Sequence, residues 1–431
     1  MQITILNGNP DAENTAFDAY LKRLSETLTT AGHQATALTL RDMDIRYCTG
    51  CWGCWVKTPG QCVARDDSAE ICRRVINADF VLFASPMIMG FPSALLKKTM
   101  DKLIPLVHPY LAMVGDEIHH LARYKSYPLA GLLLEPGDGT DQGDVQVTRE
   151  IFSRTMLNLK SQLAFTKLTD EPVESTAQAI VDAEWDPDWM PPRRPTAQVG
   201  HLQRHDGSAP SHLTVFNGSP RGKSGNTQIL LYQFLRGFEN ATGGNYEMYH
   251  LNRPQETARF REAFAKAECV LLGFPLYTDA MPGLVKAFIE VLESLCDREE
   301  NPPVGFLVQS GFPEAAHSRY VERYLEKLSV RFGSAYIGTI VEGGAEAVRY
   351  VPPRRNRKLF DALNRLGAGF GETGALDAAL LQSLAQPERL PKMMGTLFGL
   401  LAKTRVFDVW WNRQLKQNGA YEQRFAKPYK S

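Results

Sequence analysis

The sequence reads ITILNGNP at positions 3–10 and LTVFNGSP at positions 213–220. In both stretches an apolar run ends at Asn-Gly-x-Pro, and a short polar loop then leads to Asn14–Thr15 or Asn226–Thr227, where a helical pattern begins. A strand that turns through glycine into a helix presents backbone N–H groups and the positive end of the helix dipole to an anion such as phosphate. Two such elements predict two nucleotide-type α/β domains in one chain.

The repeat continues downstream in the same register. The chain has VLFASP at positions 81–86 and VLLGFP at positions 270–275, and Lys97 and Lys286 each stand eleven positions after the final proline of these runs. We therefore interpret the chain as a tandem duplication.

The first repeat is longer than the second. Pro10 and Pro86 are 76 positions apart, whereas Pro220 and Pro275 are 55 apart, which leaves 21 extra residues in the first repeat. The segment 46–66 is the candidate insertion, and it holds four of the chain's seven cysteines.

Length and composition bound the class of protein. At 431 residues the chain can form two or three domains, each with its own core. Its 48 Lys and Arg residues balance 48 Asp and Glu residues, so no basic excess points to nucleic acid. The sequence enters a strand pattern directly, so we expect no secretory leader and a cytoplasmic protein. Clustered cysteines in that setting indicate metal, redox or cluster chemistry before a disulfide framework.

Strand and helix patterns alternate through both repeats. We expect strands at 2–7, 34–40, 80–84, 129–135 and 163–168, then at 213–216, 246–251, 269–274, 304–309 and 335–341. Helices are expected between them, at 15–31, 67–78, 93–106 and 145–160, then at 227–239, 257–267, 284–294 and 313–332. This order predicts two doubly wound parallel sheets that bind ligands at the carboxyl ends of their strands.

Domain boundaries follow from composition. We expect a first domain at 1–184, a linker rich in Pro, Arg, Asp and His at 185–210, a second domain at 211–350 and a helical C-terminal extension at 351–431. The charge-free stretch 393–402 in this extension has ten residues, far short of the roughly 20 that a membrane-spanning helix needs, so no transmembrane segment is expected. We interpret it as a helix that packs on the sheet domains or on a dimer partner, with an interfacial amphipathic helix as the alternative.

The second polar loop has the residues of an anion site. Ser219, Ser224 and Thr227 offer hydroxyl groups, Arg221 adds a positive charge, and glycines permit a tight turn before the helix. The loop is neither a Walker loop nor a dinucleotide fingerprint. The alternative is a strand-to-helix turn without a ligand.

The first polar loop is a weaker candidate. Asn9, Asn14 and Thr15 could contact an anion, but Asp11 and Glu13 would repel one, and this loop contains no arginine.

The second repeat resembles a known family. SPR at positions 219–221, NT at 226–227, PLY at 275–277 and Lys286 are similar to the flavodoxin-like NADPH-dependent FMN reductase family. The cysteines of the 46–66 segment, followed by Asp66–Asp67, are similar to those of its iron–sulfur flavoprotein branch. The resemblance covers roughly the first 345 residues and leaves the helical extension outside it.

The resemblance implies two flavodoxin-like sheets of strand order 2-1-3-4-5 and an FMN cofactor. It places the FMN phosphate in the polar loop and the flavin ring on the loop after the third strand. The implied contacts in the second repeat are Ser219, Arg221, Ser224, Asn226, Thr227, Pro275, Leu276 and Tyr277. Those in the first repeat are Asn9, Asn14, Thr15, Pro86, Met87, Ile88, Met89 and Gly90.

Each repeat departs from the family pattern in its own way. The first repeat has no aromatic residue in PMIMG at positions 86–90, where the family usually places one beside the ring. The second repeat keeps Tyr277 but has no cysteine insertion. FMN in both repeats and FMN in one repeat are both compatible with these residues.

The cysteine segment packs four thiols into 15 positions, at Cys48, Cys51, Cys54 and Cys62. Short Cys-x-x-Cys steps with glycines allow four thiolates to surround a [4Fe–4S] cluster. Structural zinc sites more often use two separated Cys-x-x-Cys pairs. Thiols that stay free of metal or form a redox disulfide are the third interpretation.

One further cluster follows the third helix of the first repeat, at His108, Glu117, His119, His120, Arg123 and Tyr124. These side chains could orient an acceptor or a nicotinamide. Adjacent His119 and His120 are, however, more typical of a solvated helix.

The sequence predicts an NAD(P)H-dependent FMN reductase-like oxidoreductase that passes electrons from NAD(P)H, or from a ferredoxin, through flavin to a quinone, flavin or other small acceptor. The alternative is a flavin and iron–sulfur electron carrier or redox sensor that acts through a protein partner. A homo-oligomer or an internal pseudo-dimer is expected.

Overall fold

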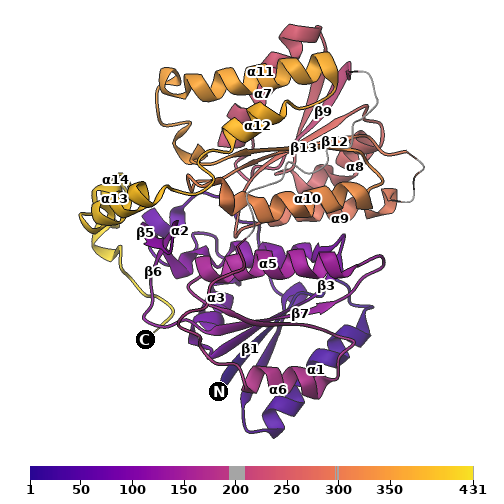
Figure 1. Ribbon diagram of the computed structural model, residues 1–431. Coiled ribbons are helices and arrows are strands. Elements are labelled where there is room, and N and C mark those ends of the chain that lie inside the picture. The colour runs from indigo at the N-terminus through magenta and orange to yellow at the C-terminus, as the bar shows by residue number, and fades with distance from the viewer. Residues whose placement is uncertain (194–208, 297, 299, 431) are drawn as a thin grey trace. The chain divides into compact units, whose positions relative to one another are not determined.

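The structure is a computed structural model that describes residues 1–193, 209–296, 298 and 300–430. The chain forms two compact units (Figure 1). The first unit comprises residues 1–192 together with 392–431, and the second comprises residues 193–391. Most of the expected linker, residues 194–208, lies outside the described residues.

The first unit is built on a sheet of five parallel strands in the order β2-β1-β3-β7-β8. The strands are β1 (Gln2–Asn7), β2 (Gln34–Thr39), β3 (Phe80–Ile88), β7 (Leu129–Glu135) and β8 (Leu163–Leu168). The short β4 (Phe91–Pro92) pairs antiparallel to the end of β3. The helices are α1 (Thr15–Thr30), α3 (Ser68–Asn77), α4 (Ala94–Asp101), α5 (Gln142–Asn158) and α6 (Val173–Val181). Figure 1 places α1 and α6 on one face of this sheet and α3 and α5 on the other.

The second unit repeats the topology in the order β10-β9-β11-β12-β13, again parallel throughout. Its strands are β9 (His212–Asn217), β10 (Asn245–His250), β11 (Val270–Pro275), β12 (Val304–Gln309) and β13 (Tyr336–Glu342). Its helices are α7 (Asn226–Thr242), α8 (Thr257–Ala265), α9 (Gly283–Val291), α10 (Arg319–Arg331), α11 (Arg357–Thr373) and α12 (Ala378–Leu384). Both units are flavodoxin-like, and the expected strand order 2-1-3-4-5 is confirmed in each.

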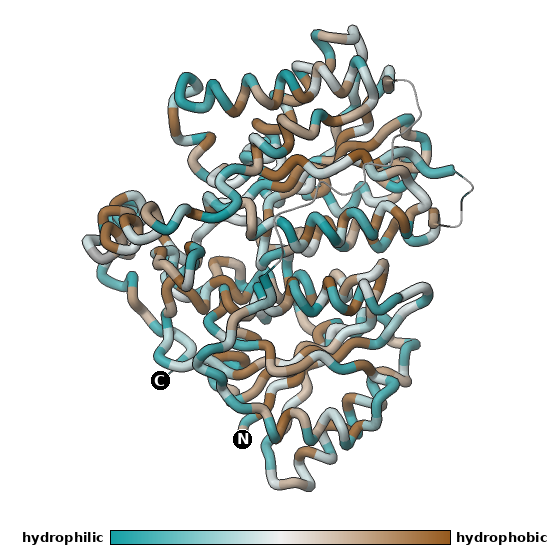
Figure 2. Tube along the Cα trace, viewed as in Figure 1, coloured by the Kyte–Doolittle hydropathy of each residue, from teal (hydrophilic) through white to brown (hydrophobic). Residues whose placement is uncertain are grey.

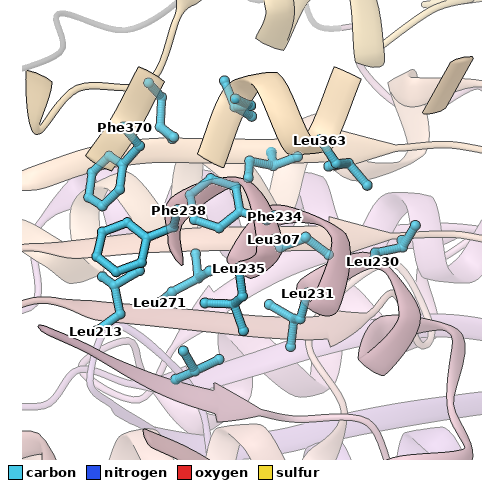
Figure 3. Close-up of a cluster of buried hydrophobic side chains, with 14 of the residues drawn as sticks. Leu213, Leu230, Leu231, Phe234, Leu235, Phe238, Leu271, Leu307, Leu363 and Phe370 are labelled. Carbon is cyan, nitrogen blue, oxygen red and sulfur yellow. The ribbon is translucent and has the colours of Figure 1, made fainter. Parts of the chain in front are cut away.

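The core of the second unit lies between its sheet and α7, as Figure 3 shows. Leu230, Phe234 and Phe238 recur at helical spacing along α7 and are buried. The helix α11 packs closely against α7. A Cβ atom added at Gly367 of α11 would lie only 1.9 Å from the Phe234 carbonyl oxygen of α7. Only glycine permits this approach, so α11 completes the second unit.

The structure divides the helical extension between the two units. The helices α11 and α12 belong to the second unit, whereas α13 (Lys392–Lys403) and α14 (Val409–Gln417) belong to the first. Helical periodicity predicts these helices but carries no information about which sheet they cover.

The expectation of a solvated helix at His119 and His120 is wrong. These residues lie in an antiparallel hairpin of β5 (Val107–Val114) and β6 (Glu117–Ala122). Gly115, with a φ of 62°, allows the tight turn between the strands. Alternation along β6 turns His119 inward, where its side chain is fully buried.

Candidate functional site

The loop between β9 and α7 is held firmly at the carboxyl edge of the second sheet. The Gly218 N–H donates to the Gly273 carbonyl oxygen at 2.7 Å, and the Ser219 N–H donates to the Asn217 side chain at 2.9 Å. A Cβ atom at Gly218 would lie 2.4 Å from Val285, so only glycine fits between the loop and α9. The loop geometry is therefore fixed before any ligand arrives.

Buried polar groups gather where this loop enters α7. Ser219, Asn226 and Thr227 are all buried. A Cβ atom at Gly225 would lie 2.3 Å from the Ser219 Oγ, so this glycine leaves room for the hydroxyl group. Among the described residues, no side chain caps α7, and the buried Asn226 Oδ1 has no hydrogen-bond partner. The start of α7 thus offers its N–H groups and a polar cradle to a ligand with both phosphate and hydroxyl groups.

Arg221 belongs to the same loop, and an acidic side chain holds its guanidinium group. Its Nη1 atom lies 3.1 Å from the Glu346 Oε1. Burial opposes the charge of Arg221, but the nearby Glu346 and Tyr277 outweigh it and raise the pKa of the guanidinium group. Burial also raises the pKa of Glu346, and Arg221 offsets that effect only in part.

The expected ring loop of the second unit is a tight turn. Tyr277 and Ala280 pair across it, and the Leu276 N–H donates to the Gln309 carbonyl oxygen at 2.8 Å. Thr278 and Asp279 have φ values of 43° and 57°, a left-handed conformation that costs free energy for residues with a side chain. Such backbone strain is typical of ligand-binding turns. The turn places the half-buried Tyr277 at the edge of the sheet.

The equivalent loop of the first unit caps its own helix. The Asn14 side chain accepts a hydrogen bond from the Phe17 N–H at 3.2 Å, which satisfies the start of α1. Its amide also donates to the Glu135 carboxylate at 2.5 Å. Thr15, the other expected contact of this loop, is exposed.

An acidic group stands in the first turn of α1. The Asp18 carboxylate accepts hydrogen bonds from Asn7, Asn9 and Arg41. Burial opposes its charge, but the hydrogen bonds from Arg41, Asn7 and Asn9 outweigh burial and lower the pKa of Asp18. The buried Asn9 is therefore committed to a carboxylate of the protein, and the neighbouring negative charge disfavours a phosphate.

The expected ring loop of the first unit is a hairpin turn rather than an open loop. The strand β3 continues to Ile88 and pairs with Phe91–Pro92, with Met89 and Gly90 at φ values of 53° and 72° between them. Met87 and Met89 are buried, whereas Pro86 is half-buried. The loop after β7 lies against this hairpin, since a Cβ atom at Gly137 would be 2.3 Å from the Met87 carbonyl oxygen.

The two ends of the cysteine segment lie next to each other in the first unit. The Arg46 N–H donates to the Asp66 carboxylate at 3.2 Å, and the Asp44 N–H donates to the Asp67 carboxylate at 2.8 Å. These hydrogen bonds bring the two ends of the segment 46–66, the candidate insertion, together.

The four thiols of this segment lie close enough for their charges to interact. Burial raises the pKa of Cys54 most, and the neighbouring Cys48, Cys62 and Cys51 raise it further. Cationic and N–H groups surround them: the Lys102 Nζ lies 3.2 Å from the Cys62 Sγ, and the Gly53 N–H donates to the Cys51 Sγ at 3.4 Å. These donors stabilise the thiolate forms of Cys62 and Cys51. Burial raises the pKa of Cys48 and of Cys54, so a bound metal group would have to stabilise the thiolate forms of these two residues.

The spacing of the thiols bears on the kind of group. Within the described part of the chain, no three of these sulfur atoms lie within 4.8 Å of one another. Tetrahedral zinc with bonds of about 2.3 Å would draw its sulfur ligands to about 3.8 Å apart. The sulfur atoms therefore lie farther apart than the ligands of a single zinc ion.

The C-terminal residues cover the cysteine segment, a feature that sequence reasoning missed. The Trp411 ring packs edge-on against Trp52 and Trp55, at centroid distances of 5.3 Å in both cases. Arg123 donates to the carbonyl oxygen atoms of Arg424 and Ala426, which ties the tail to the hairpin. The only signal in the sequence is the Trp410–Trp411 pair, and it does not identify its partners.

The polar cluster of the β5–β6 hairpin is a buried network. Glu117 accepts hydrogen bonds from Arg154 and His119, and the other nitrogen of His119 lies 2.6 Å from the Asn158 side chain. Burial lowers the pKa of His108 and of His120 to about 3, so both imidazoles are neutral at pH 7. Tyr124 is buried as well. This network supports the β5–β6 hairpin.

Residues 1–124 and 211–312 match the family described as NADPH-dependent FMN reductase. Together these segments make up more than half of the chain. The chain belongs to the NADPH-dependent FMN reductase family. Its two matching segments correspond to the two flavodoxin-like units, and the family supports an oxidoreductase with FMN as cofactor.

Individual relatives share shorter segments. Two iron-sulfur flavoproteins of Archaeoglobus fulgidus are similar to this chain. The first is 28% identical over 102 residues (24% of this chain, 48% of that protein), and the second is 36% identical over 91 residues (21% and 39%). The chain thus spans about half the length or less of these curated relatives. Among solved structures, an azoreductase from Bacillus anthracis matches with 14% identity and a TM-score of 0.29, covering 37% of this chain and 98% of that one.

Proposed function

We propose that the protein is an FMN-dependent oxidoreductase that binds one FMN per chain, in the second unit. The observation that carries this proposal is the contrast between the two helix starts. In the described chain α7 begins without a capping side chain, so its first N–H groups are open to a phosphate, and the buried Asn226 Oδ1 beside them is an unpartnered acceptor for a hydroxyl group of the ligand. By contrast, α1 is capped by Asn14 and has Asp18 in its first turn. A dianionic phosphate is stabilised at the first kind of helix start and repelled at the second.

Different residues of the second unit would contact the phosphate and the ring of FMN. The hydroxyl groups of Ser219 and Thr227 would donate hydrogen bonds to the phosphate, and Arg221 and Asn226 would complete its shell. The exposed Ser224 would support the loop, because its hydroxyl group donates to the Arg221 carbonyl oxygen at 2.8 Å. Pro275, Leu276 and Tyr277 would support the flavin ring on the strained turn at the end of β11. When bound, FMN accepts electrons from NAD(P)H and passes them to a quinone, a flavin or another small acceptor.

The first unit would bind a metal cluster through its cysteine segment. We propose that Cys48, Cys51, Cys54 and Cys62 hold a [4Fe–4S] cluster, with Lys102 and the tryptophan cover limiting the access of solvent to it. The first-unit residues Asn9, Asn14, Thr15 and Pro86–Gly90 then have structural roles. We place this chemistry in the cytoplasm, where thiols stay reduced.

The thiol segment also supports a second function. A flavin and a cluster in one chain could relay electrons to or from a protein such as a ferredoxin without a small substrate. Anaerobic oxidation of NADH and NADPH by the purified protein, with a quinone as acceptor, separates the two functions. Turnover of either nicotinamide supports the reductase, whereas normal flavin content without nicotinamide oxidation supports the carrier.

A further inference from the structure

The helix α13 presents large apolar side chains to solvent. Met393, Met394, Leu397, Leu400 and Leu401, here called the apolar face, are each between 38% and 82% exposed. They recur at steps of three and four residues along one side of the helix. Figure 2 shows the hydrophobic character of this segment.

The packed side of α13 explains this outward orientation. Cβ atoms placed at Gly395 and Gly399 would lie 3.3 Å and 3.6 Å from the Met113 side chain on β5. The helix therefore rests on the first unit through its glycines, and its large side chains point away. The continuation adds Val406, Phe407 and Val409, which are also exposed, and the Phe398 and Phe407 rings stack at 4.5 Å.

The charge of this segment differs from that of the rest of the chain. Residues 392–430 contain eight Lys and Arg residues against two acidic residues, in a chain whose formal net charge is zero. Lys392, Arg405 and Arg413 are exposed, whereas the acidic Asp408 is buried. An exposed apolar face beside basic residues matches the chemistry of an anionic lipid surface, with fatty chains beneath phosphate groups.

A second copy of the chain fits this face less well. A two-fold symmetric interface places the same patch on both subunits, so two strongly basic segments would face each other and repel. In the described residues, no helix is long and apolar enough to cross a membrane. We propose that α13 and residues 406–409 dock the protein on the surface of an anionic bilayer, with the apolar face inserted among the lipids.

Vesicle co-sedimentation of the full chain tests this proposal. We expect binding to phosphatidylcholine vesicles that contain about 30 mol% phosphatidylglycerol, weak binding to phosphatidylcholine alone, and release at high salt. The double variant Leu397→Glu/Leu400→Glu should lower the partition coefficient at least about ten-fold. The control is Val330→Glu on α10, because Val330 is also exposed, at 68%, and lies in the second unit.

Three outcomes would overturn the proposal. They are the absence of binding to anionic vesicles, equal binding to neutral vesicles, and unchanged binding by the double variant with an intact thermal unfolding transition. A wild-type dimer that the double variant converts to a monomer would instead assign the apolar face to a second copy of the chain. Because vesicle binding needs no flavin, its failure is distinguishable from failure of the proposed oxidoreductase.

Discussion

The guanidinium group of Arg221 lies 3.1 Å from the Glu346 carboxylate, at the loop where the second sheet meets α7. A carboxylate and a phosphate are alternative anionic partners for the same arginine. In the proposed FMN site, Glu346 would therefore compete with the phosphate for Arg221 and would hold the cationic side chain until the cofactor binds.

Removing this competitor should tighten FMN binding. Glu346→Gln abolishes the negative charge while keeping the shape of the side chain, so Arg221 loses its acidic partner. We expect the Kd for FMN to fall about two- to five-fold, since a partly exposed ion pair is worth at most about 1 kcal/mol. Fluorescence titration of the apoprotein measures this change. Weaker FMN binding by the variant would mean that Glu346 supports the site rather than competes for it.

A methyl group at Gly225 should damage the same site by steric conflict. The φ of −85° at this residue would accept alanine, but the added Cβ would lie 2.3 Å from the Ser219 Oγ. We expect Gly225→Ala to weaken FMN binding about ten-fold, the equivalent of about 1.4 kcal/mol.

The control for this variant is Gly369→Ala in α11. Apart from the neighbouring residues of α11 itself, no described atom lies within 4 Å of a Cβ placed there, so FMN binding should be unchanged and stability should rise by about 0.5–1 kcal/mol. Equal FMN affinity in wild type and Gly225→Ala would remove Ser219 from the phosphate site.

Acid should destabilise the first unit through His108. Burial first, then Arg123, Lys427 and His120, lower the pKa of this imidazole from 6.5 to about 3. The unfolded chain binds a proton below pH 6.5 and the folded chain does not, so stability is full above pH 6.5 and falls as the pH decreases toward 3. Between pH 7 and pH 5 this single group should cost about 2 kcal/mol.

Urea unfolding of wild type and His108→Phe at both pH values measures this contribution. Phenylalanine keeps the ring contacts with Tyr110 and Phe425 but cannot take up a proton. The variant should lose about 2 kcal/mol less than wild type on acidification. Equal losses would show that His108 is not the group that carries this acid sensitivity.

The cysteine segment should account for any bound iron. Cys54→Ser removes one of the four proposed thiolate ligands, so iron and acid-labile sulfide per chain should drop to near zero after anaerobic purification. Cys72→Ser is the matched control, because Cys72 is also buried but lies outside the segment. Zinc in place of iron, or full iron content in Cys54→Ser, would contradict the proposed cluster.

Much of the fold can be predicted from the sequence, because hydrophobic periodicity and repeated motifs are local signals. The duplicated Asn-Gly-x-Pro turn and the buried stripe of α7 follow from residues close in sequence, whereas the strand order is implied by the family resemblance. The cap on α1 is also predictable from the sequence, because asparagine is a favoured capping residue and Asn14 stands directly before the helical pattern.

Other features depend on contacts between distant residues and could not be predicted in this way. Trp411 packs against Trp52 although the two residues are far apart in the sequence, and no local pattern identifies them as partners. The β5–β6 hairpin has a short alternating pattern whose histidines look polar, although a buried network satisfies His119. The partner of Arg221, Glu346, follows the last strand of the second sheet, 125 positions away.

The most direct test of the central claim is the number of FMN molecules per chain, measured by absorbance after release from reconstituted protein. We expect one FMN in wild type, nearly none in Arg221→Ala, and one in Asn14→Ala, which removes the cap of α1 and the hydrogen bond to Glu135. Two FMN molecules per chain, or a single FMN that Asn14→Ala loses and Arg221→Ala retains, would contradict the assignment of the flavin to the second unit.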